Sequence, residues 1–186
     1  MTTTYTFTVN SFRITDTRSV HKDSDYVAMA VAVGNAAPIT VPTKSMGDLN
    51  NGTFPVNLSI EKVVVNPTDR VAFHYSITNT GFDKNVVESS LEKAASAAAG
   101  AGTKALGPAS GAASSVIDKI IGIPFANCDG VVADGTHIFL GSELATLTAG
   151  GKVYSVTDNN KGTDSPWGCG SNSQYYTTWS IAAHVI

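Results

Sequence analysis

Charged residues are scarce in this sequence. Its 186 residues include 12 Lys or Arg and 15 Asp or Glu, so charged residues make up 15% of the chain, against about a quarter in an average soluble domain. The basic residues are scattered singly and the net charge is -3, which excludes the basic stripe of a nucleic-acid-binding protein. The hydrophobic fraction of 42% argues against a disordered chain. We therefore expect a folded domain whose surface is rich in Ser, Thr, Asn and Gly.

Long apolar segments are also missing. Met1 is followed by three threonines and Tyr5 rather than by a basic segment and an apolar core, which predicts that the chain carries no secretory signal. No apolar run approaches the roughly 20 residues of a membrane-spanning helix. The sequence leaves the compartment and the oligomeric state open.

Cysteine is nearly absent. The two cysteines, Cys128 and Cys169, form no CxxC pair, which argues against a structural zinc site. In an oxidising compartment, a disulfide between them would close a long loop and stabilise the fold by about 3–4 kcal/mol. In a reducing compartment they would be free thiols. Both states stay open.

The common catalytic motifs are missing as well. The sequence has no GxSxG elbow, no HExxH motif and no Gly-rich phosphate loop. Its four histidines are scattered, at His21, His74, His137 and His184. The remaining enzyme alternative is a Cys–His pair that uses Cys128 or Cys169. We expect a protein without enzymatic activity.

What the chain has in abundance is the period-two apolar pattern of half-buried β-strands. The alternation over residues 5–9 shifts by one residue at Phe12 and Ile14, which predicts a bulge near Asn10-Ser11. The run 26–33 is a second strand, and we expect it to form a hairpin with the first across the charged loop between them.

Further strands follow, separated by turn residues. The alternation over 71–77 is the cleanest in the chain, and Asn66-Pro67-Thr68-Asp69 before it is a good turn. Other expected strands cover 56–65, 130–132, 137–140, 144–148, 152–157 and 175–185, and a long Gly- and Asn-rich loop covers 158–173. Seven to nine short strands of this kind predict a mainly β fold, an antiparallel two-sheet β-sandwich that occupies 1–186 as a single domain.

An Ala- and Gly-rich α-helical insertion, 83–123, interrupts the strands. Asp83 can cap a helix whose apolar residues recur near every 3.6 positions, and this helix should end at Gly100-Ala101-Gly102. A shorter helix is expected around 116–121. The insertion either packs over one sheet or, in the alternative, acts at a membrane.

Three carboxylates, Asp16, Asp23 and Asp25, fall in the loop between the first two strands and are candidate ligands for calcium, which prefers oxygen ligands. The other interpretation is a solvated loop. The segment Ser24-Asp25-Tyr26-Val27 resembles the entry to the second strand of calcium-dependent C2 domains, which implies an acidic calcium loop. The proline usual between that Asp and Tyr is missing, and no later Asp-x-Asp loop follows, so we do not assign the chain to that family.

The loop before the last strand has the composition of a sugar-binding loop, because aromatic rings stand beside amides and a carboxylate. The candidate ligand-binding residues are Asp164, Trp167, Asn172, Gln174 and Tyr175. The competing interpretation is that Trp167 fills the end of the sandwich core.

Together these features predict a non-enzymatic ligand-binding β-sandwich module. The segments 15–25 and 158–176 would hold a small molecule or a glycan, either with the help of calcium or as a carbohydrate-binding surface. The alternative is a membrane-active or pore-forming protein that uses the segment 84–123 without spanning the membrane in its folded form.

Overall fold

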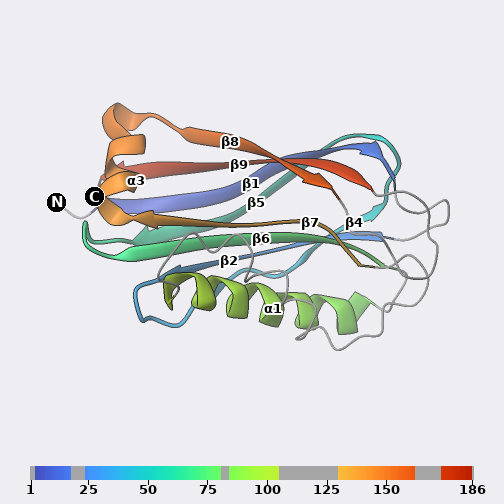
Figure 1. Ribbon diagram of the computed structural model, residues 1–186, viewed down its shortest axis with the longest axis horizontal. Helices are drawn as coiled ribbons and strands as arrows, with labels where there is room; N and C mark the ends of the chain where they lie inside the picture. The colour runs from blue at the N-terminus through green and yellow to red at the C-terminus, as the bar shows by residue number, and fades with distance from the viewer. Residues whose placement is uncertain (1–2, 18–23, 81–83, 105–129, 162–172, 186) are drawn as a thin grey trace.

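The computed structural model describes residues 3–17, 24–80, 84–104, 130–161 and 173–185. Within these ranges, two antiparallel β-sheets pack face to face, and a long helix covers the outer face of one of them (Figure 1). This arrangement confirms the predicted β-sandwich. The elements in chain order are β1 (Thr3–Asp16), β2 (Ser24–Val33), β3 (Ile39–Thr40), β4 (Lys44–Asp48), β5 (Gly52–Val64), β6 (Arg70–Thr80), α1 (Lys84–Lys104), β7 (Gly130–Leu140), α3 (Gly141–Leu147), a 3-10 turn (Ala149–Gly151), β8 (Tyr154–Lys161) and β9 (Gln174–Val185).

Four strands form sheet A, in the order β5-β1-β9-β8. One face of sheet A is buried and the other is open, so its strands alternate between buried and more exposed residues. Strand β1 shifts register against both neighbours between Val9 and Ser11, which confirms the predicted bulge. A second shift in the β1–β5 pairing falls opposite Glu61 and Lys62.

Sheet B has the order β3-β2-β6-β7, and β4 also pairs with β2. Its central strands β2 and β6 are buried along almost their whole length, because sheet A covers one face and α1 covers the other. The predicted hairpin of the first two strands is wrong, since β1 lies in sheet A and β2 in sheet B. The turn at 66–69 likewise carries the chain from one sheet to the other, from β5 to β6.

The core between the sheets is aromatic. Phe73 lies near its centre, with its ring centroid 5.4 Å from that of Trp179 and 5.8 Å from that of Phe7. The largest fully buried side chains are Trp179, Tyr75, Tyr175, Phe7, Phe12 and Phe73. Rings at these distances and tilts pack favourably beyond the area they bury.

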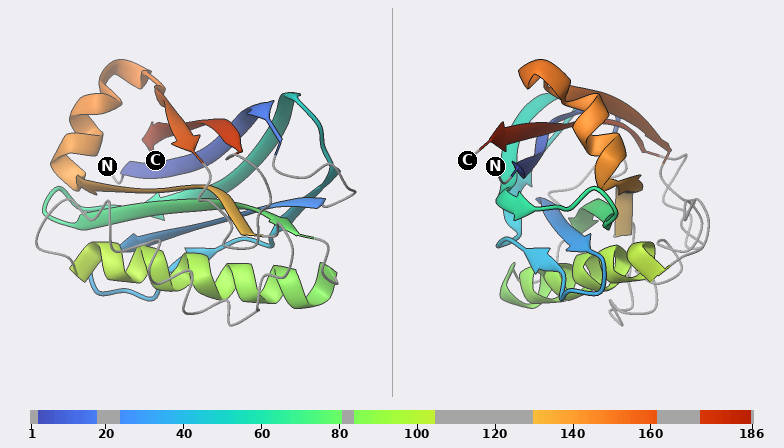
Figure 2. Two further views of the ribbon diagram at one scale, coloured as in Figure 1. Left: turned by 45° about the vertical axis from the view of Figure 1, so that its right-hand side comes forward. Right: turned by 90° about the vertical axis from the view of Figure 1, so that its left-hand side faces the viewer.

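Helix α1 makes a second, smaller core on the outer face of sheet B, and Figure 2 shows it lying along that face. Val87, Leu91 and three alanines of the helix pack against Tyr26 and three alanines of β2. The expectation that the helix ends at Gly100-Ala101-Gly102 is wrong, because α1 continues to Lys104. A Cβ atom at position 102 would lie 2.7 Å from the Cβ of Ala72, so glycine here permits close contact between helix and sheet.

One expected strand is also wrong. The segment 144–148 contributes to helix α3 and its C-cap, not to a strand. Leu144 is fully buried in the main core, and the carboxylate of Glu143 accepts a hydrogen bond from the backbone N–H of Leu140 at 2.7 Å. This contact satisfies a donor at the start of the helix. The expected cap at Asp83 and the expected helix at 116–121 lie outside the described residues.

Candidate functional site

The described ends of the two segments predicted to bind a ligand lie at the same end of the sandwich, on the right in Figure 1, which we call the loop end. In sheet A, β1 ends at Asp16, which pairs in register with Gln174 at the start of β9. In sheet B, β2 begins at Ser24. The hydroxyl of Tyr175 contacts both carboxylate oxygens of Asp25, at 3.3 and 3.2 Å. A predicted metal ligand and a predicted ligand-binding residue therefore meet between the two sheets.

Asp25 is a fully buried carboxylate. Besides the Tyr175 hydroxyl, it accepts a hydrogen bond from the side-chain amide of Asn79 at 3.0 Å, and these bonds compensate for its removal from water. Asp16 is exposed at the end of β1, and Asp23 lies outside the described residues. Within the described ranges, no group of three or more His, Cys, Asp or Glu side chains could hold a metal ion.

Two neighbouring tyrosines of β9 point to opposite faces of sheet A. Tyr175 is 1% exposed and faces the core, so its ring has no contact with solvent through which it could stack on a sugar. Tyr176 faces outward, because successive residues of a strand alternate. The guanidinium carbon of Arg13 lies 4.5 Å from the centre of the Tyr176 ring, a cation–π contact that fixes the ring at the surface.

Amide groups stand beside this ring. Arg13, Tyr176 and Asn159 are neighbours in register across β1, β9 and β8, and the side-chain amide of Gln174 donates a hydrogen bond to the Asn159 side-chain oxygen. We call these four residues the Tyr176 platform.

Gln174 is a residue that the sequence predicts for the site. The predicted residues Asp164, Trp167 and Asn172, and the cysteines Cys128 and Cys169, lie outside the described residues.

A second polar group lies inside the sandwich, nearer the open edge formed by β7 and β8. One carboxylate oxygen of Asp158, Oδ2, accepts three hydrogen bonds, from the Tyr75 hydroxyl at 2.7 Å, His137 Nε2 at 2.8 Å and Trp179 Nε1 at 2.8 Å. Tyr75 and His137 belong to sheet B, while Asp158 and Trp179 belong to sheet A. Asp158 therefore connects the two sheets, and we call these four residues the Asp158 cluster.

The environment fixes the charge of this cluster. Burial alone would raise the pKa of Asp158, but the hydrogen bonds from His137, Tyr75 and Trp179 outweigh it, so that the pKa is below its usual value. Burial, followed by the negative charge of Asp158, raises the pKa of Tyr75. At neutral pH the carboxylate is ionised and the phenol is protonated. The side chains of His137 and Asp158 are only 24% and 22% exposed, which suits a structural cross-link between the sheets.

The sequence prediction missed the Asp158 cluster because it placed Asp158 in a loop. In the structure β8 runs to Lys161, and the inward-facing series that starts at Tyr154 and Val156 continues through Asp158 and Asn160. The signal was the unbroken period of two. It was hidden because polar residues take over the inward positions halfway along the strand.

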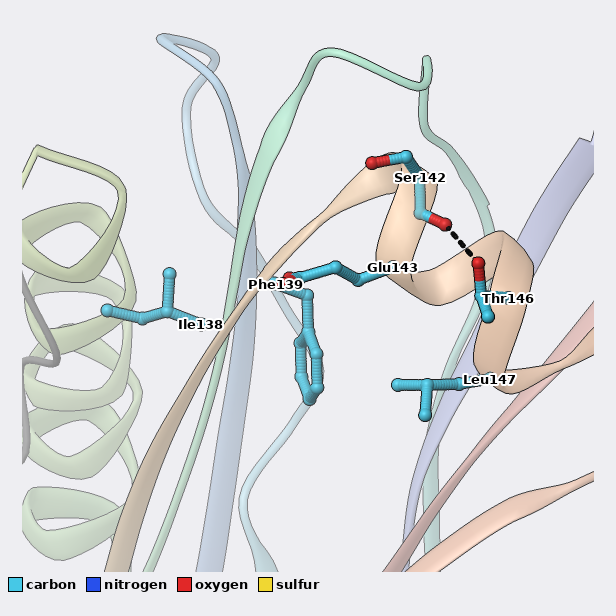
Figure 3. A pocket seen from close by; sticks show the side chains of 6 residues that line it. All are labelled: Ile138, Phe139, Ser142, Glu143, Thr146 and Leu147. Carbon is cyan, nitrogen blue, oxygen red and sulfur yellow. Dashed lines mark hydrogen bonds between the residues drawn. The ribbon is translucent and has the colours of Figure 1, made fainter.

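A pocket of about 550 Å³ lies at the opposite end of the molecule, beside α3 (Figure 3). It is lined by Ile138, Phe139, Ser142, Glu143, Thr146 and Leu147. Two of its three polar side chains already have partners in the helix, since the hydroxyl of Thr146 donates to the carbonyl of Ser142 at 3.0 Å and Glu143 caps the helix start. The pocket lacks the convergent free polar groups of a ligand site.

None of the helices within the described ranges combines the length and the apolar character needed to cross a bilayer. Comparison with known proteins adds no relative, since no family model and no curated protein matches the chain.

Proposed function

We propose that this chain is a non-enzymatic carbohydrate-binding β-sandwich module, which holds a glycan at its loop end against the Tyr176 platform. The observation that carries the proposal is the row formed by Arg13, Tyr176 and Asn159 on the open face of sheet A. It combines an outward aromatic ring with hydrogen-bonding groups on both sides.

The chemistry of the row suits a pyranose. One face of such a sugar is apolar and packs on an aromatic ring, and its hydroxyls need donors and acceptors around the rim. Arg13 holds the ring of Tyr176 from one side, while Asn159 and Gln174 orient each other on the other side. A ring and amides fixed before binding lose little conformational entropy when a ligand arrives.

The test is isothermal titration calorimetry with soluble cello-, chito-, manno- and galacto-oligosaccharides. We expect at least one series to bind, Tyr176→Ala to weaken that binding about tenfold or more, and Tyr176→Phe to retain it, because the ring persists. If both variants have the urea midpoint of the natural chain, their fold is intact. Absence of binding across the four series, or equal binding by Tyr176→Ala, overturns the proposal.

Calcium belongs to the proposal as an aid to binding, with Asp16, Asp23 and Asp25 as its ligands. In support, Asp16 and Asp25 both lie at the loop end, at the last residue of β1 and near the start of β2. Calcium at a hundred times its dissociation constant should add about 2.7 kcal/mol to the unfolding free energy. Asp16→Asn should reduce this gain. If calcium leaves the unfolding free energy unchanged, the calcium part is wrong and the glycan part stands on its own test.

We do not propose the membrane-active alternative. Among the side chains of α1 that the structure describes, Val87, Leu91 and three alanines pack against sheet B, and in this group only Val87 and Leu91 are larger than alanine. A helix that binds a membrane surface needs a strongly apolar face.

A further inference from the structure

We propose that the open face of sheet A carries a second saccharide subsite near the chain termini, so that the ligand is a linear oligosaccharide lying along the sheet. This inference rests on the proposed function and extends it to the class of ligand. The subsite is a hollow of about 470 Å³ lined by Thr4, Thr6, Glu61, Lys62, Ala182 and His184. We call it the His184 hollow.

The lining of the His184 hollow has the mixed character that a sugar requires. Thr6 and Ala182 are neighbours in register on β1 and β9 and supply a mostly apolar lining. The hydroxyl of Thr6 lies 3.0 Å from His184 Nε2, and the exposed Glu61 and Lys62 add an acceptor and donors. Hydroxyl groups both donate and accept, so a polyol uses both kinds of partner.

A β-bulge builds this lining. The β1–β5 register passes from Tyr5 opposite Val63 to Phe7 opposite Ile60, so that Thr6 faces two residues, Glu61 and Lys62. In a regular strand, consecutive side chains point to opposite faces. The bulge instead brings both Glu61 and Lys62 to the hollow. It also holds Lys62 at a φ of 59°, a left-handed conformation that residues other than glycine seldom adopt. Backbone strain that is retained beside a polar surface hollow, as at Lys62, is typical of a functional position.

An uncharged polar surface joins the hollow to the Tyr176 platform. One row of four hydroxyl side chains crosses the whole sheet in register, Ser59, Thr8, Ser180 and Ser155. The next row toward the platform pairs Thr178 with Thr157, whose hydroxyls are 2.8 Å apart. Along β9 the platform and the hollow are separated by the eight residue steps from Tyr176 to His184, roughly 27 Å of extended chain. A single sugar ring cannot reach both, whereas a linear oligosaccharide can.

The experiment measures affinity against chain length by calorimetry, using the oligosaccharide series that binds, from disaccharide to octasaccharide. Two linked contacts raise the apparent affinity through effective concentration, so we expect a rise of at least about tenfold once the chain spans both sites. In Lys62→Gly and His184→Ala this rise should disappear while disaccharide affinity is unchanged. Tyr176→Ala should weaken every length.

The matched control is Asn57→Gly, because Asn57 is the other residue of β5 with a positive φ, at 51°, and does not line the hollow. Lys62→Gly should keep the urea midpoint of the natural chain, since it relieves backbone strain, and Asn57→Gly should keep the length dependence. If affinity does not depend on length, or if Lys62→Gly retains the rise, the second subsite is wrong and the platform stands. If no length binds, the proposed function itself has failed.

Discussion

The Asp158 cluster provides the strongest prediction about stability. Asp158→Asn replaces a carboxylate that accepts three hydrogen bonds by an amide of the same shape. A hydrogen bond to a charged group contributes about 1.5–3 kcal/mol and a neutral one about 0.5–1.5 kcal/mol, so the change costs about 1 kcal/mol per bond, or about 3 kcal/mol in all. Because the amide costs less free energy to bury than the ion, part of this loss is offset. We expect a net loss of about 2 kcal/mol at pH 7.

The pH dependence of this loss has a definite sign. Because the pKa of Asp158 is lowered by folding, its ionised form contributes stability above the unfolded-state pKa of about 3.9, and the contribution is lost as the pH falls through the folded-state value. The difference between the natural chain and Asp158→Asn should therefore begin to shrink as the pH falls below about 3.9.

Urea unfolding at pH 7 and in an acid series measures both effects. The matched control is Asp48→Asn, because Asp48 is an exposed carboxylate that accepts a hydrogen bond from the hydroxyl of Ser24. This control should change the unfolding free energy by less than about 0.5 kcal/mol. A loss of under about 0.5 kcal/mol for Asp158→Asn at pH 7, or a loss that persists undiminished in acid, would refute the role given to Asp158.

Three further predictions concern sheet B. Ser76→Ala and Thr78→Val should each leave stability unchanged or raise it by about 1 kcal/mol in urea unfolding, because these buried hydroxyls have no hydrogen-bond partner within the described part of the chain; a clear loss would contradict this. Gly135→Ala should cost about 2 kcal/mol by the same assay, since the new Cβ would lie 2.6 Å from the ring of Tyr75, and an unchanged midpoint would show that the contact is not tight. Burial lowers the pKa of His74 to about 3; the nearby His137 adds to this effect and a backbone hydrogen bond partly offsets it. Because the unfolded chain therefore binds a proton at a higher pH than the folded chain, the free energy of unfolding should fall by about 3 kcal/mol between pH 6.5 and 4. His74→Leu should remove this pH dependence of the free energy of unfolding.

The sequence predicts the strands well because their apolar residues keep a strict period. The bulge at residues 10–11 follows from the shift in phase at Phe12, and the structure places it there. Which strands pair does not follow in the same way. Neither the loop 15–24 nor the turn at 66–69 shows in its composition that the chain crosses from one sheet to the other, so the expected hairpin was wrong.

Other features depend on tertiary contacts that a local pattern does not encode. Helix propensity predicts that α1 stops at its glycines, whereas close packing of Gly102 on Ala72 lets it continue. At the candidate site, the sequence pattern predicts Gln174 and Tyr175 as ligand-binding residues. Which tyrosine faces outward depends on which residues of β9 point to the core, and in the structure Tyr175 points inward and Tyr176 outward. The Asp158 cluster joins residues of four different strands; the period of two can turn Asp158 inward, but it does not show which side chains of the other strands meet it.

The central claim is that the Tyr176 platform binds a glycan. It is tested most directly by assigned NMR spectra of the natural chain titrated with the oligosaccharide that calorimetry selects. We predict that the saturable shift changes centre on Arg13, Asn159, Gln174 and Tyr176. Shift changes confined to other surfaces, such as the pocket beside α3, would contradict the account.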